Sequence, residues 1–403
     1  MKSNEPNRVA PKRKSLALNA MVGAAQRILR GRLILHLPDG RVFDCVGAEP
    51  GGEAQLFVRD ARLADRVFAS GDVGFAESYL LGEWDTPDLP GLLAVCSDNF
   101  DALGRAARGW GLKSLLNLLG HLRRENTRKG SKENILAHYD LGNAFFAQWL
   151  DPSMTYSSAL FSTADESLEA GQANKYRALA NQLDLKPGQH VLEIGCGWGG
   201  FAEYAAKERG ARVTAITISD EQHAFARARI QKAGLNDQVS IEMRDYRDLR
   251  GKFDHVASIE MFEAVGERYW PTYFSKITEC LRDSGRAALQ IITIRDDLFE
   301  GYRARVDFIQ KYVFPGGMLP SISRLQQVTA HNGLKIAQLE QFGRSYAETL
   351  AQWRHRFESA WRTIAPLGFD ERFNRLWRFY LAYCEAGFRT GRIDVAQLAL
   401  VRA

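Results

Sequence analysis

The 403-residue sequence predicts an α/β protein in which a doubly wound, mostly parallel sheet follows a small α+β domain. From about residue 131 onward, short apolar runs alternate with helical segments, which is typical of successive βαβ units. A glycine-rich turn joins one of these strands to the next helix in "VLEIGCGWGGF" at 191–201. Near the N-terminus, Asp39-Gly40 separates two apolar runs and predicts a β-hairpin, and mixed helical segments follow it.

The regions of the chain differ in composition. Residues 1–30 are basic and are expected to begin as a loosely ordered segment, and residues 31–105 form the small domain. Residues 106–130 have the pattern of a basic amphipathic linker helix, which either packs on a neighbouring domain or docks on anionic lipid. Residues 131–403 form the α/β domain, with an aromatic-rich insertion at 295–325 and a helical region that closes the chain.

The expected strands of the sheet are short runs rich in Val, Ile and Leu. In a doubly wound sheet, a ligand binds beyond the carboxyl ends of the strands. The last of these runs carries a polar residue, Gln290, whose buried amide must find hydrogen-bond partners or lower the stability of the fold. The runs are "HVLEIG", "RVTAITI", "VSIEMR", "FDHVASIE" and "AALQIITI".

Composition and charge restrict the class of protein. The net charge is +5, and the basic runs "NRVAPKRKS" and "HLRRENTRKGSK" favour anionic surfaces or, alternatively, are solvated flexible segments. The five cysteines are scattered without metal-ligand spacing, so we expect reduced thiols, no metal site and a cytoplasmic protein. No apolar run has the length of a membrane span, which predicts a chain that at most contacts a membrane from one side.

The glycine-rich turn has the spacing of a cofactor loop. Glu193 ends the strand, and Gly195, Gly197 and Gly199 follow at alternate positions. Glycines allow the backbone to turn sharply and to approach a ligand closely. The pattern E-x-G-x-G-x-G is typical of class I methyltransferases, which have a Rossmann-like fold and bind S-adenosylmethionine. The turn therefore predicts this cofactor, with Glu193 and the three glycines in its site.

Motifs that follow one another along residues 131–390 together resemble the cyclopropane-fatty-acyl-phospholipid synthases and their relatives that modify mycolic acids. The preceding domain, with "GDVGFAESYLLGEWDTPDL", resembles the N-terminal domain of the phospholipid-acting branch. The resemblance implies methyl transfer from S-adenosylmethionine to the cis double bond of an unsaturated phospholipid acyl chain. The motifs are "HYDLGNAFFAQWLDPSMTYSSALF", "VLEIGCGWGG", "TISDEQ", "RDYRDL", "SIEMFEAVGERYWPTYF" and "FPGGMLPS".

The resemblance also implies particular cofactor contacts. Tyr156 and Ser157 lie in the first motif, Thr217 and Gln222 follow the second strand, and Tyr246 would lie against the adenine. From the residues alone, the two tyrosines would equally fit ordinary half-buried positions.

In the resembled family, methyl transfer leaves a carbocation on the acyl chain, and a bound bicarbonate removes a proton so that the ring closes. The resemblance places the bicarbonate site on Glu263, Tyr346, Ile292, Ser158 and Gln290. Two of these positions depart from the family pattern, with Ser158 in place of a cysteine and Gln290 in place of a histidine. A glutamine amide donates and accepts hydrogen bonds but does not titrate. We therefore expect a bound bicarbonate as the partner of Gln290.

Two products are compatible with this pattern. The first is a cyclopropane fatty acyl chain, and the second is a methyl-branched or methylene unsaturated chain that forms without ring closure. Because Gln290 removes a titratable group from the proton-removing site, the second product is a close alternative.

Other function classes fit less well. The basic runs suggest a nucleic-acid methyltransferase, but base-amino methylation uses an Asn/Asp-Pro-Pro-aromatic turn where this chain has "SIEMFEAVG". A non-catalytic lipid-binding protein is disfavoured by the intact glycine loop together with Glu263 and Tyr346. The expected partner is thus unsaturated phospholipid and not nucleic acid. The expected enzyme is peripherally associated with the inner face of the cell membrane, and a homodimer is plausible.

Overall fold

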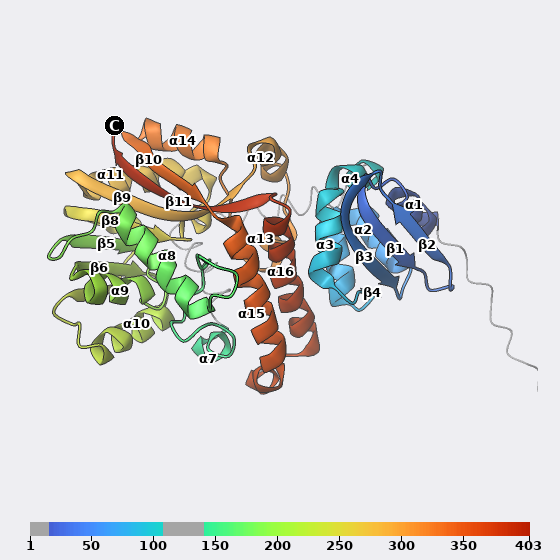
Figure 1. Cartoon of the computed structure of the whole chain (residues 1–403), viewed down its shortest axis with the longest axis horizontal. Helices are drawn as coiled ribbons and strands as arrows, with labels where there is room; N and C mark the ends of the chain where they lie inside the picture. Colours follow the sequence, from blue (N-terminus) through green and yellow to red (C-terminus); the bar gives the residue numbers. More distant parts are fainter. Residues whose placement is uncertain (1–15, 108–140) are drawn as a thin grey trace, which may run out of the picture. The chain divides into compact units, whose positions relative to one another are not determined.

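In the computed structural model, the chain divides into two compact units, Met1–Leu112 and Lys113–Ala403. The structure describes residues 16–107 and 141–403, which are coloured by sequence in Figure 1. From residue 108 on, the expected linker helix therefore lies outside the described residues, as does the basic segment up to residue 15. Among the described helices, none is long and apolar enough to cross a membrane.

The first unit contains a small sheet with the strand order β2-β1-β3-β4. The expected hairpin is confirmed, because β1 and β2 pair antiparallel on either side of Asp39-Gly40, with Gly40 at φ 88°. Strand β3 pairs parallel with β1 and antiparallel with β4. Helix α1, within the region expected to be a loosely ordered N-terminus, contacts α2 and α4. The elements are α1 (Leu16–Ala25), β1 (Arg30–His36), β2 (Val42–Val46), β3 (Glu49–Val58), α2 (Arg62–Leu80), β4 (Trp84–Asp85), α3 (Leu89–Asp98) and α4 (Phe100–Ala107).

In the second unit, strands alternate with helices up to β9. Further helices and the two strands β10 and β11, which pair antiparallel, follow β9 in this unit. Its first elements are α7 (Asn143–Phe146), α8 (Leu168–Gln182), β5 (His190–Ile194), α9 (Gly200–Arg209), β6 (Arg212–Thr217), α10 (Asp220–Lys232), β7 (Val239–Met243), η1 (Tyr246–Asp248), β8 (Phe253–Ile259), η2 (Phe262–Ala264), η3 (Glu267–Tyr269), α11 (Trp270–Cys280) and β9 (Leu281–Ile294). The remaining elements are α12 (Asp296–Arg303), α13 (Phe308–Tyr312), α14 (Ile322–His331), β10 (Leu334–Gln341), α15 (Gly343–Ile364), η4 (Ala365–Leu367), α16 (Glu371–Arg389) and β11 (Ile393–Arg402).

The large sheet has the strand order β10-β11-β9-β8-β5-β6-β7, and it confirms the predicted doubly wound α/β class. Strands β7, β6, β5, β8 and β9 pair parallel, whereas β11 is antiparallel to both of its neighbours. The expectation that a helical region closes the chain is wrong at its end. Helices α15 and α16 are followed by β11, which inserts between β9 and β10, where the backbone N–H and C=O groups along both of its edges find hydrogen-bond partners.

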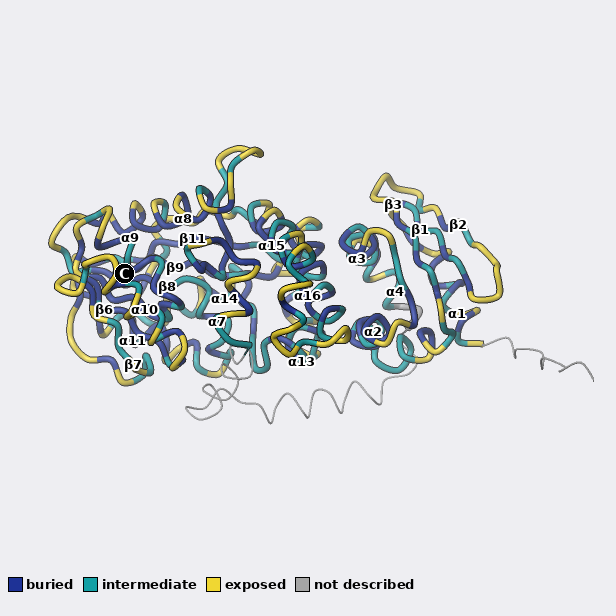
Figure 2. Tube along the Cα trace, turned by 90° about the horizontal axis from the view of Figure 1, so that it is seen from below, coloured by how far each residue is buried: buried dark blue, intermediate teal, exposed yellow. Residues whose placement is uncertain are grey.

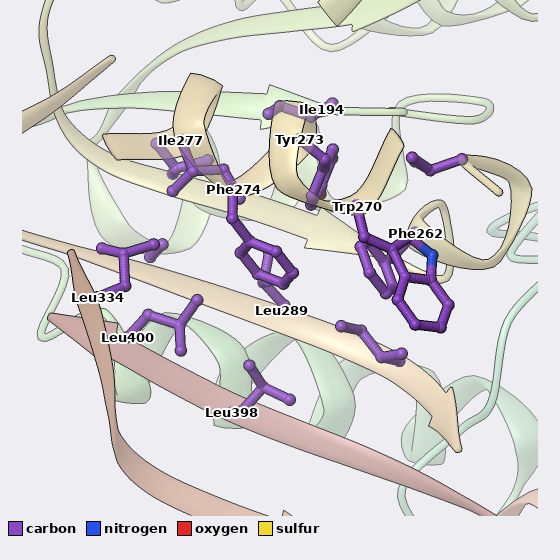
Figure 3. Close-up of a cluster of buried hydrophobic side chains, with 14 of the residues drawn as sticks. Ile194, Phe262, Trp270, Tyr273, Phe274, Ile277, Leu289, Leu334, Leu398 and Leu400 are labelled. Atoms are coloured by element: carbon purple, nitrogen blue, oxygen red, sulfur yellow. The ribbon is translucent and has the colours of Figure 1, made fainter. Parts of the chain in front are cut away.

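The core lies on both faces of this sheet, because successive residues of a strand point to opposite sides. Val191 packs with the α8 and α9 side chains, while the adjacent Leu192 packs with those of α11. Figure 3 shows part of the second cluster, in which Phe262, Trp270 and Phe274 lie over the strands near Leu289 and Leu398. In Figure 2 the strands β8, β9 and β11 of this sheet are largely dark blue, whereas the surface loops are yellow or teal. The buried sheet thus provides a rigid frame for the loops at its carboxyl edge.

Two histidines near the amino ends of the central strands should make stability depend on pH. Desolvation lowers the pKa of both His190 and His255. His255 Nδ1 accepts a hydrogen bond from the Arg286 backbone N–H at 3.3 Å, so its Nε2 is the protonated nitrogen facing Gln189 Oε1.

Because the folded state binds protons more weakly than the unfolded state at these histidines, we expect stability to be lost as pH falls below about 6.5. Thermal unfolding from about pH 7 to about pH 5 should be less pH-dependent in His255→Gln than in the wild type. The matched control is His331→Gln, which replaces an exposed histidine at the end of α14. An unchanged pH dependence in His255→Gln would contradict the assignment.

Candidate active site

The glycine loop connects β5 to α9, and at several of its positions the backbone has angles that favour glycine. Gly195, Gly197 and Gly199 have φ values of 81°, 53° and 81°, a region that other residues rarely adopt. A Cβ added to Gly195 would lie 2.6 Å from Met261 Cγ. The Gly195 and Cys196 amides both donate to the Ile216 carbonyl, which ties the loop to the end of β6. The loop therefore lies at the carboxyl edge of the sheet, as the sequence predicts.

Glu193, at the end of β5, is buried below this loop with 2% of its surface exposed. Desolvation raises the pKa of Glu193 to about 8, opposed by the charges of Arg229 and Lys175. Its Oε2 has no hydrogen-bond partner within the described residues. A buried polar atom without a hydrogen-bond partner is costly in a folded protein, so this oxygen fits a polar group on a ligand at the loop.

The end of β6 provides the other expected contacts for the cofactor. Thr217 Oγ1 donates to Gln222 Oε1 at 2.9 Å, so these two expected residues lie side by side. Ser219 caps α10, because its hydroxyl accepts from the Gln222 amide. Tyr246, after β7, is packed edge-on against Tyr273, and desolvation raises the pKa of Tyr246 to about 12. These groups surround the same edge of the sheet as the glycine loop.

Tyr156 and Ser157 lie on the segment before α8. The Tyr156 hydroxyl lies 2.6 Å from that of Tyr380, and its ring packs between Trp149 and Trp353. Ser157 Oγ accepts a hydrogen bond from Lys175 Nζ at 2.6 Å. Both expected contact residues are therefore held in place by groups from distant parts of the chain.

A carboxylate group at the end of β8 forms the centre of the site. Glu260 accepts hydrogen bonds from the Ser158 amide at 2.8 Å and from Gln290 Nε2 at 2.7 Å, both on Oε1. The Tyr346 hydroxyl donates to its Oε2 at 2.6 Å. Charge-assisted hydrogen bonds of this kind are the strong ones, and here they come from three separate segments. The expected residues Ser158, Gln290 and Tyr346 are thus brought together, around Glu260.

The backbone at Glu260 is also unusual. Its φ is 49°, in the left-handed region that costs a residue with a side chain of order 1 kcal/mol or more. Its amide donates to the Gln290 carbonyl at 2.8 Å, which extends the β8–β9 ladder by one bond. Strain of this kind persists only where the surroundings enforce it, and it is concentrated at functional sites.

Glu263 is the second carboxyl group, three residues later. Its Oε1 accepts from the Ile292 amide at 2.5 Å, so the expected pair of Glu263 and Ile292 is also in contact. Its Oε2 is buried and has no hydrogen-bond partner within the described residues. Its backbone carbonyl accepts from the Met318 amide at 2.9 Å, which connects the turn after β8 to the segment before α14.

The two carboxyl groups differ in protonation. Desolvation, and then the charge of Glu260, raise the pKa of Glu263 to about 8. Desolvation also raises the pKa of Glu260, but Lys175 and the donors Tyr346 and Gln290 oppose that shift. Neighbouring carboxyl groups with different environments divide into an acid and a base. The three donors that face Glu260 fit a negative charge there, whereas Glu263, with one donor and a raised pKa, is the group that holds a proton more readily.

The bound bicarbonate expected as a partner of Gln290 stays a prediction, and the partners of Gln290 within the described residues are groups of the protein itself. The Gln290 amide donates to Glu260 Oε1 and to the Ser158 carbonyl, and its own oxygen accepts from Gln397 Nε2. A protein carboxylate therefore uses the donors that were expected to hold bicarbonate.

Glu260 itself was missed from the sequence. In "SIEMFEAVG" two acids lie three residues apart after an apolar strand, and the family resemblance selects only Glu263. The signal that could have found Glu260 is its position directly at the strand end, where side chains face a ligand in this fold.

Comparison with known proteins places the chain among lipid-modifying enzymes. The family model described as "Mycolic acid cyclopropane synthetase" matches residues 126–398. The chain belongs to this family.

Curated relatives cover nearly the whole length. The tuberculostearic acid methyltransferase UfaA1 of Mycobacterium tuberculosis is 40% identical over 95% of this chain and 92% of its own. The cyclopropane-fatty-acyl-phospholipid synthase of Escherichia coli is 36% identical over 87% of this chain and 88% of its own. The resemblance seen in the sequence is thus confirmed, and the chain is an S-adenosylmethionine-dependent methyltransferase of a family that modifies lipids.

A solved structure agrees with the fold. The mycolic acid cyclopropane synthase CmaA1, complexed with SAH and CTAB, has a TM-score of 0.63 and is 28% identical. It covers 67% of this chain and 97% of its own. S-adenosylmethionine is therefore the cofactor that the glycine loop and the ends of β5 and β6 fit.

Proposed function

We propose that the protein transfers a methyl group from S-adenosylmethionine to the double bond of an unsaturated phospholipid acyl chain, and that Glu260 accepts the proton released afterwards. The observation that carries the proposal is the Glu260 carboxylate, held by Ser158, Gln290 and Tyr346 at the carboxyl edge of the sheet. These donors are the groups that the family resemblance assigned to a bound base.

The reaction balances without a further reactant. The alkene attacks the sulfonium methyl, a carbon–carbon bond forms, the sulfur–methyl bond breaks, and S-adenosylhomocysteine leaves. The resulting carbocation then loses a proton to a carboxylate. Because an alkene is a weak nucleophile, its orientation against the methyl group contributes much of the rate. The protein contributes the charged Glu260, whereas Glu263, as a neutral acid, adds no second base to the site.

The fixed position of Glu260 favours a product without a ring. Ring closure requires proton removal from the new methyl group while the adjacent carbon is still cationic. A carboxylate held by three donors, on a backbone in the left-handed region, has a fixed position, and we propose that it faces the carbons of the acyl chain and not the new methyl group. A hydride shift then moves the charge to the more substituted carbon before the proton is lost. The expected product is a methyl-branched unsaturated chain, because a methylene group would require removal of a proton from the new methyl group itself.

A cyclopropane chain is the second candidate product. It is supported by the likeness to the E. coli cyclopropane-fatty-acyl-phospholipid synthase, which extends over 87% of this chain. The same likeness supports a phospholipid as substrate, because the solved mycolic acid enzyme covers only 67% of this chain. Contact with the inner face of the cell membrane, a cytoplasmic location and a homodimer stay predictions from the sequence.

Mass spectrometry of the fatty acids tests the proposal. The protein is incubated with S-adenosylmethionine and vesicles of a phospholipid that carries a monounsaturated chain, and double bonds are then located by ozonolysis. We expect a gain of one CH2 with the alkene retained. A gain of one CH2 with loss of the alkene would identify the ring product instead. If S-adenosylmethionine bound but no lipid gained mass, the proposed function would be wrong.

A further inference from the structure

We propose that Gln397 is a positioning residue, which orients the Gln290 amide so that its NH2 group faces Glu260. This inference rests on the proposed function, since it concerns the same carboxylate. Gln397 does not contact Glu260 itself but acts through Gln290.

Strand pairing brings the two glutamines together. Strands β11 and β9 are antiparallel, and Gln397 and Gln290 are direct partners in their register. Gln397 Nε2 lies 3.0 Å from Gln290 Oε1 and 3.2 Å from the backbone carbonyl of Lys175 in α8. Each of the two glutamines is only 1% exposed. The contact is thus closed to water.

The polarity of this chain of amides follows from its two ends. A glutamine amide has nearly the same shape in either orientation, so hydrogen bonds decide which end faces which neighbour. Gln397 faces the backbone carbonyl of Lys175, which can only accept, and must present its NH2 group to that oxygen. The oxygen of Gln290 is thereby directed toward Gln397, and its NH2 group is directed toward Glu260. In the opposite orientation, Gln290 would place an oxygen against a carboxylate.

A glutamine at position 397 lowers the stability of the fold, because part of its amide is buried without a hydrogen-bond partner among the described residues. Its Oε1 is buried and has no hydrogen-bond partner within residues 16–107 and 141–403. The residues on the same face of β11, Val395 and Ala399, are apolar and fully buried, so an apolar residue would suit the sheet at this position. A buried polar group with an unpaired atom calls for an explanation, and the orientation of Gln290 provides one.

Ionisable groups face Glu260 from several elements. They are Lys175 from α8, Glu263 from η2 and Tyr346 from α15. Within the part of the chain that the structure describes, Gln397 makes no hydrogen bond to the charged atoms of these groups, and its bond to Lys175 is to the backbone carbonyl. Replacing Gln397 should therefore change the ionisation of Glu260 through Gln290.

The pH profile of methyl transfer tests this role. In Gln397→Leu, the Gln290 oxygen loses its donor, and the Gln290 amide is held only by its bonds to Glu260 and to the Ser158 carbonyl, so its orientation toward Glu260 is less firmly fixed. We expect the acidic limb of the turnover profile to move up by about one pH unit, while the affinity for S-adenosylmethionine stays that of the wild type. Gln397→Met keeps the length of the side chain and should give the same shift. It replaces Gln397→Leu in the experiment if the leucine variant folds poorly. The matched control is Gln182→Leu, which removes another buried glutamine amide from the end of α8.

A double-mutant cycle separates positioning from a general loss of stability. If Gln397 acts through Gln290, then adding Gln397→Leu to Gln290→Leu should cause no further shift of the profile. A wild-type profile in both Gln397 variants, or an equal shift in the Gln290→Leu background, would overturn the inference. Failure of the proposed function itself would look different, because the wild-type protein would then methylate no lipid.

Discussion

Replacing Glu260 with glutamine should reduce methyl transfer to lipid by about a thousandfold, because a general base typically contributes 10²–10⁴-fold. Glutamine keeps the length and shape of the side chain but has no negative charge to accept the proton. Binding of S-adenosylmethionine, measured by calorimetry, and the midpoint of thermal unfolding should remain near wild-type values. The control is Glu279→Gln, at an exposed position on α11. Near wild-type turnover in Glu260→Gln would show that another group removes the proton.

A second replacement tests the same role of Glu260, in this case by restoring activity with an added anion. Glu260 has φ 49°, so glycine fits its backbone without strain. Glu260→Gly would leave the Ser158 amide, the Gln290 NH2 group and the Tyr346 hydroxyl without their acceptor. We expect added bicarbonate or formate to restore part of the turnover in Glu260→Gly but not in Glu260→Gln, where the amide fills the space. Equal responses in the two variants would contradict this account.

Replacing Glu385 with alanine should lower the free energy of unfolding by about 3 kcal/mol, because it breaks a buried ion pair. Glu385 is fully buried in α16, where its carboxylate pairs with Arg354 of α15 at 3.0 Å and with Arg389 at 2.5 Å. Both arginines are partly exposed, which places the expected loss at the lower end of the range for buried pairs. Urea unfolding followed by circular dichroism measures it.

The matched control for this prediction is Glu358→Ala. Glu358 also pairs two arginines of the α15–α16 hairpin, but its side chain is 33% exposed. Pairs of this kind contribute up to about 1 kcal/mol. A loss of stability in Glu385→Ala no greater than in Glu358→Ala would show that burial does not strengthen the Glu385 cluster.

Much of the fold could be predicted from local patterns. The alternation of strands and helices, the glycine loop at 191–201 and the hairpin at Asp39-Gly40 are each specified by residues close together in the sequence. Strand β11 was not predicted, because its apolar run fits a buried helix as well as a strand. Its identity depends on pairing with β9 and β10, which are distant in the chain.

The sequence predicted most of the residues of the site but not the contact at its centre. Ser158, Gln290 and Tyr346 come from separate segments and do meet, as the family resemblance implied. The sequence could not show that their shared partner is Glu260. Which of two acids in one turn faces the site depends on the backbone angle at Glu260 and on the register of β8 and β9. Neither of these is visible in local residue patterns.

The most direct test of the role of Glu260 is the turnover of the wild-type protein in buffer depleted of bicarbonate. Methyl transfer from S-adenosylmethionine to unsaturated phospholipid vesicles would be followed under argon, with and without added bicarbonate. Because the chain's own carboxylate takes up the donors Ser158, Gln290 and Tyr346, we predict the same rate in both conditions. A rate that collapses on depletion and returns when bicarbonate is added would contradict the account.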